Sequence, residues 1–210
     1  QVNSFYDSYL KSKNSILPFV TCKLALSKDF FMVNKKEKWI TNQFSRGRVH
    51  LLRSNHDCII TSSKTVLKDN PYLTCRIEGL ENRTPSRIIL DNNLKIPIKS
   101  NILKESSKYR TIIFFNKGNN KRVKILKKLK IDLFRIPLDL NGDLDLIQCL
   151  IKAKELGFYR IFLECGKKMI TSFLHKNLID DFILFVSDRN LLNNGRNNVK
   201  EQLKFFLSRK

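Results

Sequence analysis

The stretch that decides the fold occupies residues 61–76 and reads TSSKTVLKDNPYLTCR. A strand-like apolar run at residues 58–61 leads into it, and a short helical or turn pattern through Val66 follows. That pattern should end near Asn70, because a proline disfavours helical geometry in the residue before it. A strand that opens into a polar turn and a short helix places these residues where open α/β sheets bind their ligands.

Strand-like and helix-like segments alternate on both sides of this stretch. Strands are expected at residues 17–26, 58–61, 87–90, 111–115, 131–136, 160–163 and 182–186. Helices are expected after Thr41, at 121–130, after Asp143 and at 167–175, with Thr41 and Asp143 as N-caps. Alternating strands and helices imply crossover connections. The predicted fold is therefore a three-layer α/β domain with a mostly parallel mixed sheet flanked by helices.

Composition excludes several classes of protein. The chain has 210 residues, of which 42% are hydrophobic, so it can bury a core. No apolar run approaches the roughly 20 residues of a membrane span, and the N-terminus lacks a signal-peptide pattern. Five cysteines and three histidines are scattered without metal-ligand spacing. We expect a soluble cytoplasmic protein with reduced thiols, no metal and no membrane partner.

The formal net charge of +21 has two interpretations. A basic surface attracts polyanions, which would make the chain a nucleic-acid-binding module. The alternative is a compositional bias, because Lys, Asn, Ile and Phe abound throughout. The densest basic run, residues 121–130, keeps apolar residues at helical spacing, which indicates a solvated helix face. The second interpretation is favoured, and no nucleic-acid partner is expected.

A second segment with possible chemistry is LECGKK at residues 163–168. An expected strand ends in Glu164, and Gly166 opens an expected helix with Lys167 beside it. Backbone N–H groups at a helix N-terminus, together with a nearby lysine, suit a phosphate group. A simple tight turn is the commoner explanation for a single glycine before a helix.

Six short segments carry a resemblance to a known family. They are PFVTCKLALS at 18–27, WIT at 39–41, VHLLR at 49–53, TVLKDNPYLTCR at 65–76, RIILD at 87–91 and LECG at 163–166. In this order they resemble the reductase domain of bacterial riboflavin biosynthesis. The resemblance implies a dihydrofolate-reductase-like fold and NADPH as cofactor. It also implies reduction of the ribosyl group of 5-amino-6-(5-phosphoribosylamino)uracil to a ribityl chain.

The resemblance also implies roles for individual residues. Substrate contacts fall on Arg53, Leu73, Arg76 and Glu164, with the arginines near the phosphate. Cofactor contacts fall on Ala25, Trp39, Thr65 and Asp69, to which the helix start adds Gly166 and Lys167. Lys23 and Asp69 are the catalytic candidates for proton transfer and charge stabilisation. Ordinary alternatives are a surface charge for Arg53, core positions for Leu73 and Trp39, and a turn-former for Asp69.

Several positions depart from the family pattern. Phe30 stands where the family has glycine, Glu37 where a serine contacts substrate, Cys165 where a first glycine stands, and Asn92 where a serine often contacts cofactor. Phenylalanine cannot adopt a positive φ at low cost. The final strand pair is also expected to be reduced. These departures allow a second, less favoured hypothesis: a catalytically weak or inactive reductase-fold domain that supports an upstream deaminase or an oligomer.

Residues 1–16 are interpreted as a connector and residues 17–210 as the reductase domain. The run Asn3-Ser4-Phe5 resembles the segment that joins the family's reductase to an upstream zinc-dependent pyrimidine deaminase. The deaminase signature itself is absent from the chain. A bifunctional parent protein and a homo-oligomer are therefore expected. The choice between NADPH and NADH stays open at the level of individual residues.

Overall fold

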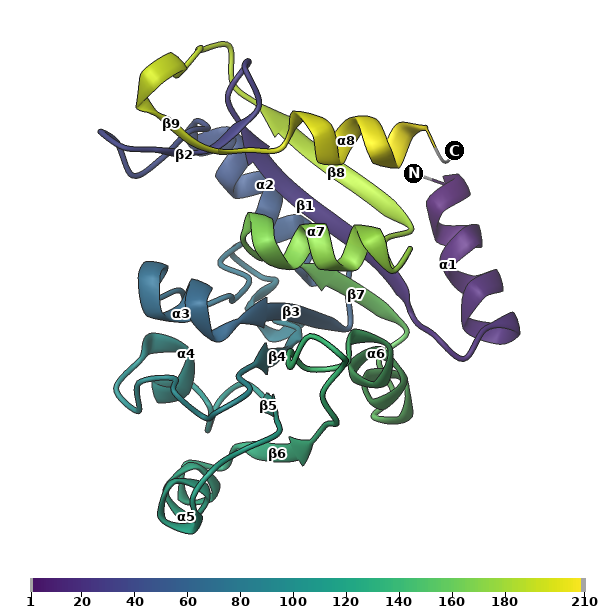
Figure 1. Ribbon diagram of the computed structural model, residues 1–210, viewed down its shortest axis with the longest axis vertical. Helices are drawn as coiled ribbons and strands as arrows, with labels where there is room; N and C mark the ends of the chain where they lie inside the picture. Colours follow the sequence, from purple (N-terminus) through teal and green to yellow (C-terminus); the bar gives the residue numbers. More distant parts are fainter. Residues whose placement is uncertain (1, 209–210) are drawn as a thin grey trace.

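The computed structural model describes residues 2–208, so residue 1 of the expected connector and residues 209–210 of the expected domain lie outside it. Its centre is a seven-stranded sheet in the order β6-β5-β4-β3-β7-β1-β8 (Figure 1). The strands are β1 (Phe19–Leu26), β3 (Cys58–Ser62), β4 (Ser86–Leu90), β5 (Thr111–Phe115), β6 (Asp132–Arg135), β7 (Arg160–Leu163) and β8 (Asp181–Val186). Neighbouring strands in this sheet pair in parallel, which confirms the expected α/β fold.

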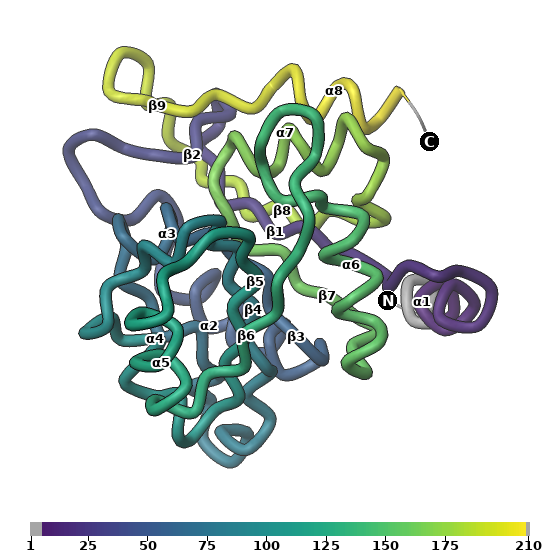
Figure 2. The backbone as a smooth tube through the Cα atoms, turned by 60° about the horizontal axis from the view of Figure 1, so that its bottom comes forward, coloured from purple at the N-terminus to yellow at the C-terminus, as the bar shows by residue number. Residues whose placement is uncertain are grey.

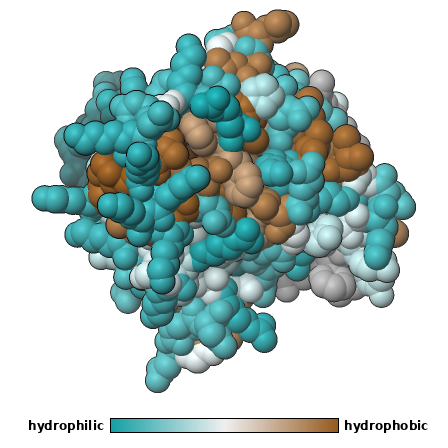
Figure 3. Space-filling model, turned by 90° about the horizontal axis from the view of Figure 1, so that it is seen from below, coloured by the Kyte–Doolittle hydropathy of each residue, from teal (hydrophilic) through white to brown (hydrophobic). Residues whose placement is uncertain are grey.

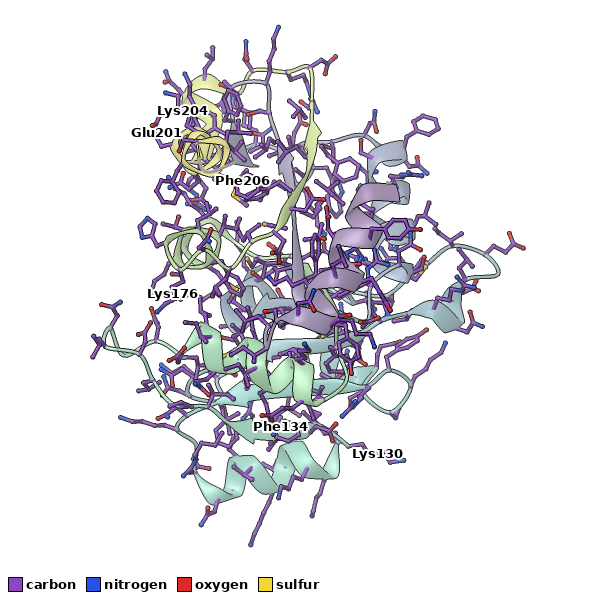
Figure 4. All side chains as sticks on the ribbon, turned by 90° about the vertical axis from the view of Figure 1, so that its right-hand side faces the viewer. Lys130, Phe134, Lys176, Glu201, Lys204 and Phe206 are labelled. Carbon is purple, nitrogen blue, oxygen red and sulfur yellow. The ribbon has the colours of Figure 1, made fainter. Side chains whose placement is uncertain are left out.

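Helices cover both faces of the sheet and give the expected three layers, which Figure 4 shows from the side. One face packs against α2 (Gln43–Ser54), α3 (Ser63–Asp69), α4 (Asn101–Lys104) and α5 (Asn120–Lys128). The other packs against α6 (Leu146–Glu155), α7 (Lys167–His175) and α8 (Lys200–Leu207). Alternation along each strand divides the core in two: in β3, Ile60 faces the α6–α8 layer and Ile59 the α2–α5 layer.

A small second sheet, which the sequence pattern did not indicate, lies beside the main one. It consists of β2 (Phe31–Asn34) and β9 (Gly195–Asn198), paired antiparallel. Gly195 is required there, because an added Cβ would overlap the Phe31 ring. The antiparallel pairing expected within a mixed sheet is therefore found in this separate pair. The ambiguous tail after residue 190 forms the short helix η2 (Leu192–Asn194), β9 and α8.

The N-terminal segment that is interpreted as a connector forms a helix, α1 (Val2–Asn14). Figure 2 shows it at one side of the body, near α6. Lys11 Nζ lies 2.7 Å from Asp180 Oδ1, and Lys154 Nζ of α6 donates to the Ser12 carbonyl at 2.8 Å. Asp180 also accepts from the Val20 N–H at 2.7 Å, so the helix is anchored where β1 begins.

Two predicted helix caps are wrong by one or two residues. Asn42, not Thr41, caps α2, because its side-chain oxygen accepts from the Ser45 N–H at 2.9 Å. Asp145, not Asp143, caps α6 by accepting from the Ile147 N–H at 2.9 Å. Asp143 instead forms an ion pair with Lys168 at 2.9 Å.

The basic run of residues 121–130 confirms the interpretation of a solvated helix face. Leu126 of α5 is buried in the core, while Lys121, Lys124, Lys127 and Lys128 are exposed. Figure 3, which views the end of the molecule that carries α5 and β6, shows hydrophilic side chains over most of the surface. The charge of this run therefore lies on solvent-facing side chains outside the core.

Two compositional expectations can be checked against the described residues. Cys22, Cys58, Cys75 and Cys149 are buried and Cys165 is partly buried, and all five thiols are free. Within residues 2–208, the helices are all too short or too polar to cross a membrane.

Arg87 of β4 is a fully buried cation that the sequence pattern did not single out. Its guanidinium donates to the carbonyls of Tyr72, Glu105 and Tyr109, at 3.1, 3.3 and 2.9 Å, and to the Thr111 hydroxyl. Burial lowers the pKa of Arg87 to about 10, which leaves it charged at neutral pH. Arg87 thus holds the segment around Tyr72 against the sheet.

Replacing Arg87 by methionine should lower the free energy of unfolding by about 3 kcal/mol, because several buried carbonyls lose their donor. The matched control is Arg110→Met, whose ion pair with Asp132 is half exposed and should change stability by roughly 0.5 kcal/mol. Urea unfolding followed by circular dichroism measures both variants. Equal losses in the two would contradict the structural role of Arg87.

Candidate active site

The strand order makes the carboxyl ends of β3, β7 and β1 the candidate ligand site. From β3 the chain runs outward through β4, β5 and β6, then returns to insert β7 between β3 and β1. The helices that follow β3, β4 and β5 cover one face of the sheet, and those that follow β6 and β7 cover the other. Where the strand order reverses, between β3 and β7, neighbouring connections leave on opposite faces, and this opens space beyond the strand ends. Both segments that the sequence singled out, residues 61–76 and 163–168, follow these strands directly.

The centre of this edge is an ion pair between Arg53 of α2 and Glu164, which follows β7. Arg53 Nε donates to Glu164 Oε1 at 2.7 Å, and Nη2 donates to Oε2 at 3.2 Å, so the contact is bidentate. The two side chains are only 11% and 13% exposed. Burial alone would raise the pKa of Glu164, but the charge and hydrogen bonds of Arg53, together with Lys23, hold it below its ordinary value. Glu164 is therefore a carboxylate.

Lys23 of β1 lies beside this pair. It projects from the same face of the sheet as Glu164, since Cys22 and Leu24 on either side of it fill the opposite core. Burial lowers the pKa of Lys23 below its ordinary value; Glu164 raises it and Arg53 lowers it further. Lys23, Arg53 and Glu164 together form a largely buried cluster with an excess positive charge.

His50 extends the cluster from α2 to the loop at residues 70–76. Its Nδ1 lies 2.9 Å from the Thr74 carbonyl, and its Nε2 lies 3.2 Å from Nη2 of Arg76. The Thr74 carbonyl also accepts from Arg53 Nη1 at 3.0 Å. Burial lowers the pKa of His50; Arg53 and Arg76 lower it too, against a raising contribution from Thr74. His50 is thus neutral at pH 7.

The loop at residues 70–76 follows an unusual backbone path. Asn70 and Leu73 both have positive φ values, 41° and 55°. A leucine in this region carries strain, which persists only where the surroundings fix it. Leu73 is 4% exposed and packs in the core on the α2–α5 face. Its ordinary interpretation as a core residue thus accounts for its burial.

The candidate cofactor residues lie around the same edge. Ser62 caps α3 and contacts the Thr65 hydroxyl at 3.0 Å. Gly166 caps α7 with φ −83°, and no atom lies within 4 Å of where a Cβ would be. Gly166 is therefore not demanded by its backbone conformation or by protein contacts, and the space beside it is open. Ala25 and Lys167 are partly exposed, on β1 and at the start of α7.

Two predicted cofactor residues lie on the surface. Trp39 is 53% exposed, so its interpretation as a core aromatic is wrong. The Arg46 guanidinium carbon and the Lys38 ammonium nitrogen lie over the Trp39 ring, 5.0 and 5.1 Å from its centroid. Asp69 is exposed at the last turn of α3, away from the strand end at which that helix starts. The groups that set the pKa of Lys23 are Glu164, Arg53 and Cys22, so the two predicted catalytic residues do not form one electrostatic unit.

The departures from the family pattern have structural consequences. Phe30 adopts φ 68°, the conformation that suits glycine, while its ring packs against the core. Glu37 forms an exposed ion pair with Arg189 at 3.2 Å. Asn92 donates to the Gly142 carbonyl at 3.1 Å. Burial raises the pKa of the Cys165 thiol, which keeps it protonated.

Neither described hollow of the surface coincides with this edge. One, with a volume of about 480 Å³, lies between α7 and α8 beside Glu201 and Lys204, which Figure 4 labels. The other lies near Glu81 and Tyr109. Neither hollow is lined by a predicted site residue. Over residues 2–208, His, Cys, Asp and Glu side chains form no group of three or more able to hold a metal ion.

Comparison with known proteins identifies a family. Residues 18–189 match the RibD C-terminal domain. The riboflavin biosynthesis protein RibD of Aquifex aeolicus is 31% identical over 191 residues, covering 90% of this chain and 51% of that protein. The chain thus spans about half the length of the curated RibD proteins that it matches.

Other relatives span a larger share of their own length or have solved structures. A 2,5-diamino-6-ribosylamino-4(3H)-pyrimidinone 5′-phosphate reductase of Debaryomyces hansenii is 30% identical, with 87% of this chain and 79% of that protein covered. The structure of Acinetobacter baumannii RibD matches with a TM-score of 0.73 and 26% identity, covering 90% of this chain and 51% of the other. A riboflavin biosynthesis reductase of Saccharomyces cerevisiae, at 22% identity and a TM-score of 0.71, shares the fold over 94% of this chain and 87% of its own.

The charge cluster predicts opposite pKa changes at Lys23. In Glu164→Gln the pKa of Lys23 should fall, because the carboxylate that raises it is gone. In Arg53→Met it should rise, because a neighbouring positive charge is removed. Nuclear magnetic resonance of ¹³C-labelled lysine measures both. Shifts in the same direction in the two variants would contradict the cluster.

The strain at Phe30 predicts an inverted order of two substitutions. Phe30→Gly should be more stable than Phe30→Ala by about 1 kcal/mol, because both lose the ring but only alanine keeps a Cβ at positive φ. Met32 of β2, which packs against the same core, is the control: there alanine should be the more stable. Thermal unfolding measures all four, and alanine matching glycine at position 30 would contradict the strain.

Proposed function

The chain belongs to the RibD C-terminal domain family, and on this premise we propose that it is an NADPH-dependent reductase of riboflavin biosynthesis. The substrate is 5-amino-6-(5-phosphoribosylamino)uracil, whose ribosyl group becomes a ribityl chain. The name of the Debaryomyces relative describes a phosphorylated ribosylaminopyrimidine as well, with amino groups at C2 and C5 of the ring. The two compounds share the 5′-phosphate and the sugar, on which the proposed reaction takes place.

The observation that carries the proposal is the buried cluster of Lys23, Arg53 and Glu164 at the reversal point of the sheet. Its carboxylate is held ionised by Arg53 and can accept hydrogen bonds from the N–H groups of an aminopyrimidine. The excess positive charge complements an anionic substrate. A buried cluster on three different elements, coupled electrostatically, is typical of a functional site.

The two arginines of the site, Arg53 and Arg76, have different roles with respect to the substrate phosphate. Arg53 uses three of its N–H groups on Glu164 and Thr74, so its first role is to position the carboxylate. Arg76 is exposed, and a guanidinium carries five N–H donors, so several of its donors can reach a phosphate. Leu73 lies between the two arginines in the sequence and is buried. It supplies the apolar wall of the pyrimidine site.

The residues around the strand ends fit a nicotinamide cofactor. The open space beside Gly166, the N–H groups that begin α7 and the nearby Lys167 suit its phosphates. The exposed Trp39 offers an aromatic surface, and Ala25, Thr65 and Asp69 complete the set. NADPH would supply a hydride to C1′ of the ring-opened sugar.

The protein's own contribution is positioning and proton control. Glu164 orients the pyrimidine through hydrogen bonds, and Arg53 holds Glu164 in place. The Lys23 ammonium group, whose pKa is lowered by burial, can donate a proton to the sugar oxygen O4′ as the glycosylamine opens to an imine. Asp69, exposed at the last turn of α3, is the second candidate for proton transfer, and would exchange protons with solvent rather than with Lys23. Fixed geometry between the hydride donor and C1′ supplies the rest of the acceleration.

The wider context of the proposal is a cytoplasmic homo-oligomer that forms the reductase part of a bifunctional deaminase/reductase. The competing hypothesis is an inactive domain of the same fold. It draws on Glu37 and Asn92, which are engaged with Arg189 and Gly142 rather than presented to a ligand. Turnover decides between the two hypotheses.

Turnover is measured as the loss of NADPH absorbance, with the ribityl product identified by mass spectrometry. Arg76→Ala should raise the KM of the phosphorylated substrate roughly 10- to 100-fold, because charge-assisted hydrogen bonds are lost, with little change in kcat. Arg83→Ala on η1 (Glu81–Arg83) removes the same charge from an exposed position and should leave KM unchanged.

Calorimetric titration with NADPH tests the cofactor separately. Saturable binding that weakens in Trp39→Ala supports the proposal. A folded chain that binds no NADPH up to millimolar concentration, or that binds it without turnover, would overturn the reductase and leave the inactive domain.

A further inference from the structure

His50 stands between the two arginines of the proposed site, and its hydrogen bonds select one tautomer. Two backbone groups compete for Nδ1: the Thr74 carbonyl at 2.9 Å, which can only accept, and the Arg76 N–H at 3.2 Å, which can only donate. The shorter contact, with Thr74, favours the proton on Nδ1. Nε2 is then unprotonated and faces Arg76 Nη2 at 3.2 Å, which can only donate. The other neutral tautomer would set an N–H against the guanidinium and leave the short Thr74 contact unmade. The neutral ring with its proton on Nδ1 therefore satisfies the Thr74 carbonyl and the Arg76 guanidinium together, at the expense of the longer contact with the Arg76 backbone N–H.

The long Arg76 side chain is exposed and starts from a loop, so it would lose considerable conformational freedom on binding an anion. A hydrogen bond from Nη2 to a half-buried imidazole reduces that cost by fixing the guanidinium in advance. Only one of its five N–H groups is used in this contact. The others stay available to the ligand.

We propose that His50 is a positioning residue, which holds the Arg76 guanidinium toward the substrate phosphate by accepting a hydrogen bond at Nε2. The inference rests on the proposed reductase function and adds His50 to the residues that determine recognition of the phosphate. His50 itself touches neither the substrate nor the cofactor. It acts through Arg76.

The charged groups around His50 make this arrangement sensitive to pH. Arg53 faces it from its own helix α2, Arg76 from the loop at residues 70–76, and Glu164 from the end of β7. Protonation would convert Nε2 into a donor against the Arg76 guanidinium and add a third positive charge beside two arginines. Because burial and these arginines lower the pKa of His50, the acceptor survives at neutral pH and is lost as pH falls below the ordinary histidine value.

Two substitutions separate positioning of Arg76 from simple support of the loop. His50→Asn retains a donor near the Nδ1 position for Thr74 but has no acceptor at Nε2. His50→Gln retains an acceptor near the Nε2 position for Arg76 but loses the donor to Thr74. The asparagine variant should therefore keep its melting temperature and raise KM roughly 10-fold, with kcat unchanged. The glutamine variant should melt earlier but keep a near wild-type KM.

The substrate and the pH provide independent readouts. With the dephosphorylated substrate, His50→Asn and wild type should share one KM, and in an Arg76→Ala background His50→Asn should add no further loss. As pH falls, KM should rise more steeply in wild type than in His50→Gln. That variant keeps a neutral acceptor and corrects for titration of the substrate phosphate itself.

The outcomes are distinguishable. If wild type turns over and His50→Asn keeps the wild-type KM, or if the KM changes follow the melting temperatures, the role of His50 is overturned while the reductase stands. If wild type binds NADPH but does not reduce the substrate, the proposed function fails and takes the His50 inference with it.

Discussion

The pair between Arg53 and Glu164 is the interaction on which the site depends. It joins α2 to the end of β7 across 111 residues of sequence, and both oxygen atoms of the Glu164 carboxylate accept hydrogen bonds from Arg53. Replacing such a pair by apolar side chains often costs a fold nothing, whereas removing one partner leaves an uncompensated charge. The presence of this ion pair at the reversal point of the sheet is therefore better explained by a role in ligand binding or catalysis than by a contribution to stability. Lys23, His50 and Thr74 are all arranged around it.

The central sheet could be predicted because parallel strands are buried on both faces and so appear as short apolar runs between helices. β4 and β5 follow such runs closely. The β2–β9 pair could not, because Phe31 pairs with Asn198 far along the chain and its strand is only half buried. The caps were misplaced because Thr41 and Asn42 are both good capping residues. Only the fold determines which side chain reaches the first free N–H.

The site divides in the same way. Local motifs around Thr61–Arg76 and Glu164 predicted where ligands would bind, and the resemblance implied roles for single residues. The ion pair itself and the place of His50 depend on contacts between distant segments: the partners of His50 lie 24 and 26 residues away. A histidine three residues before Arg53 on a helix offered one signal, since that spacing puts both side chains on one face. Phe30 shows the reverse case, in which a residue other than glycine adopts a positive φ at the expense of strain.

The position of β1 has a consequence for how the protein acquires this structure. β1 precedes the other strands in the chain, yet its two neighbours are β7 and β8, which begin at Arg160 and Asp181. During synthesis, an apolar strand therefore emerges long before either of its pairing edges exists. The carboxyl-end site, which needs β1, β3 and β7 together, forms only when the last third of the chain closes the sheet. Folding is thus governed by late, long-range pairing, which is slow and leaves the β1 edges exposed to other chains in the meantime.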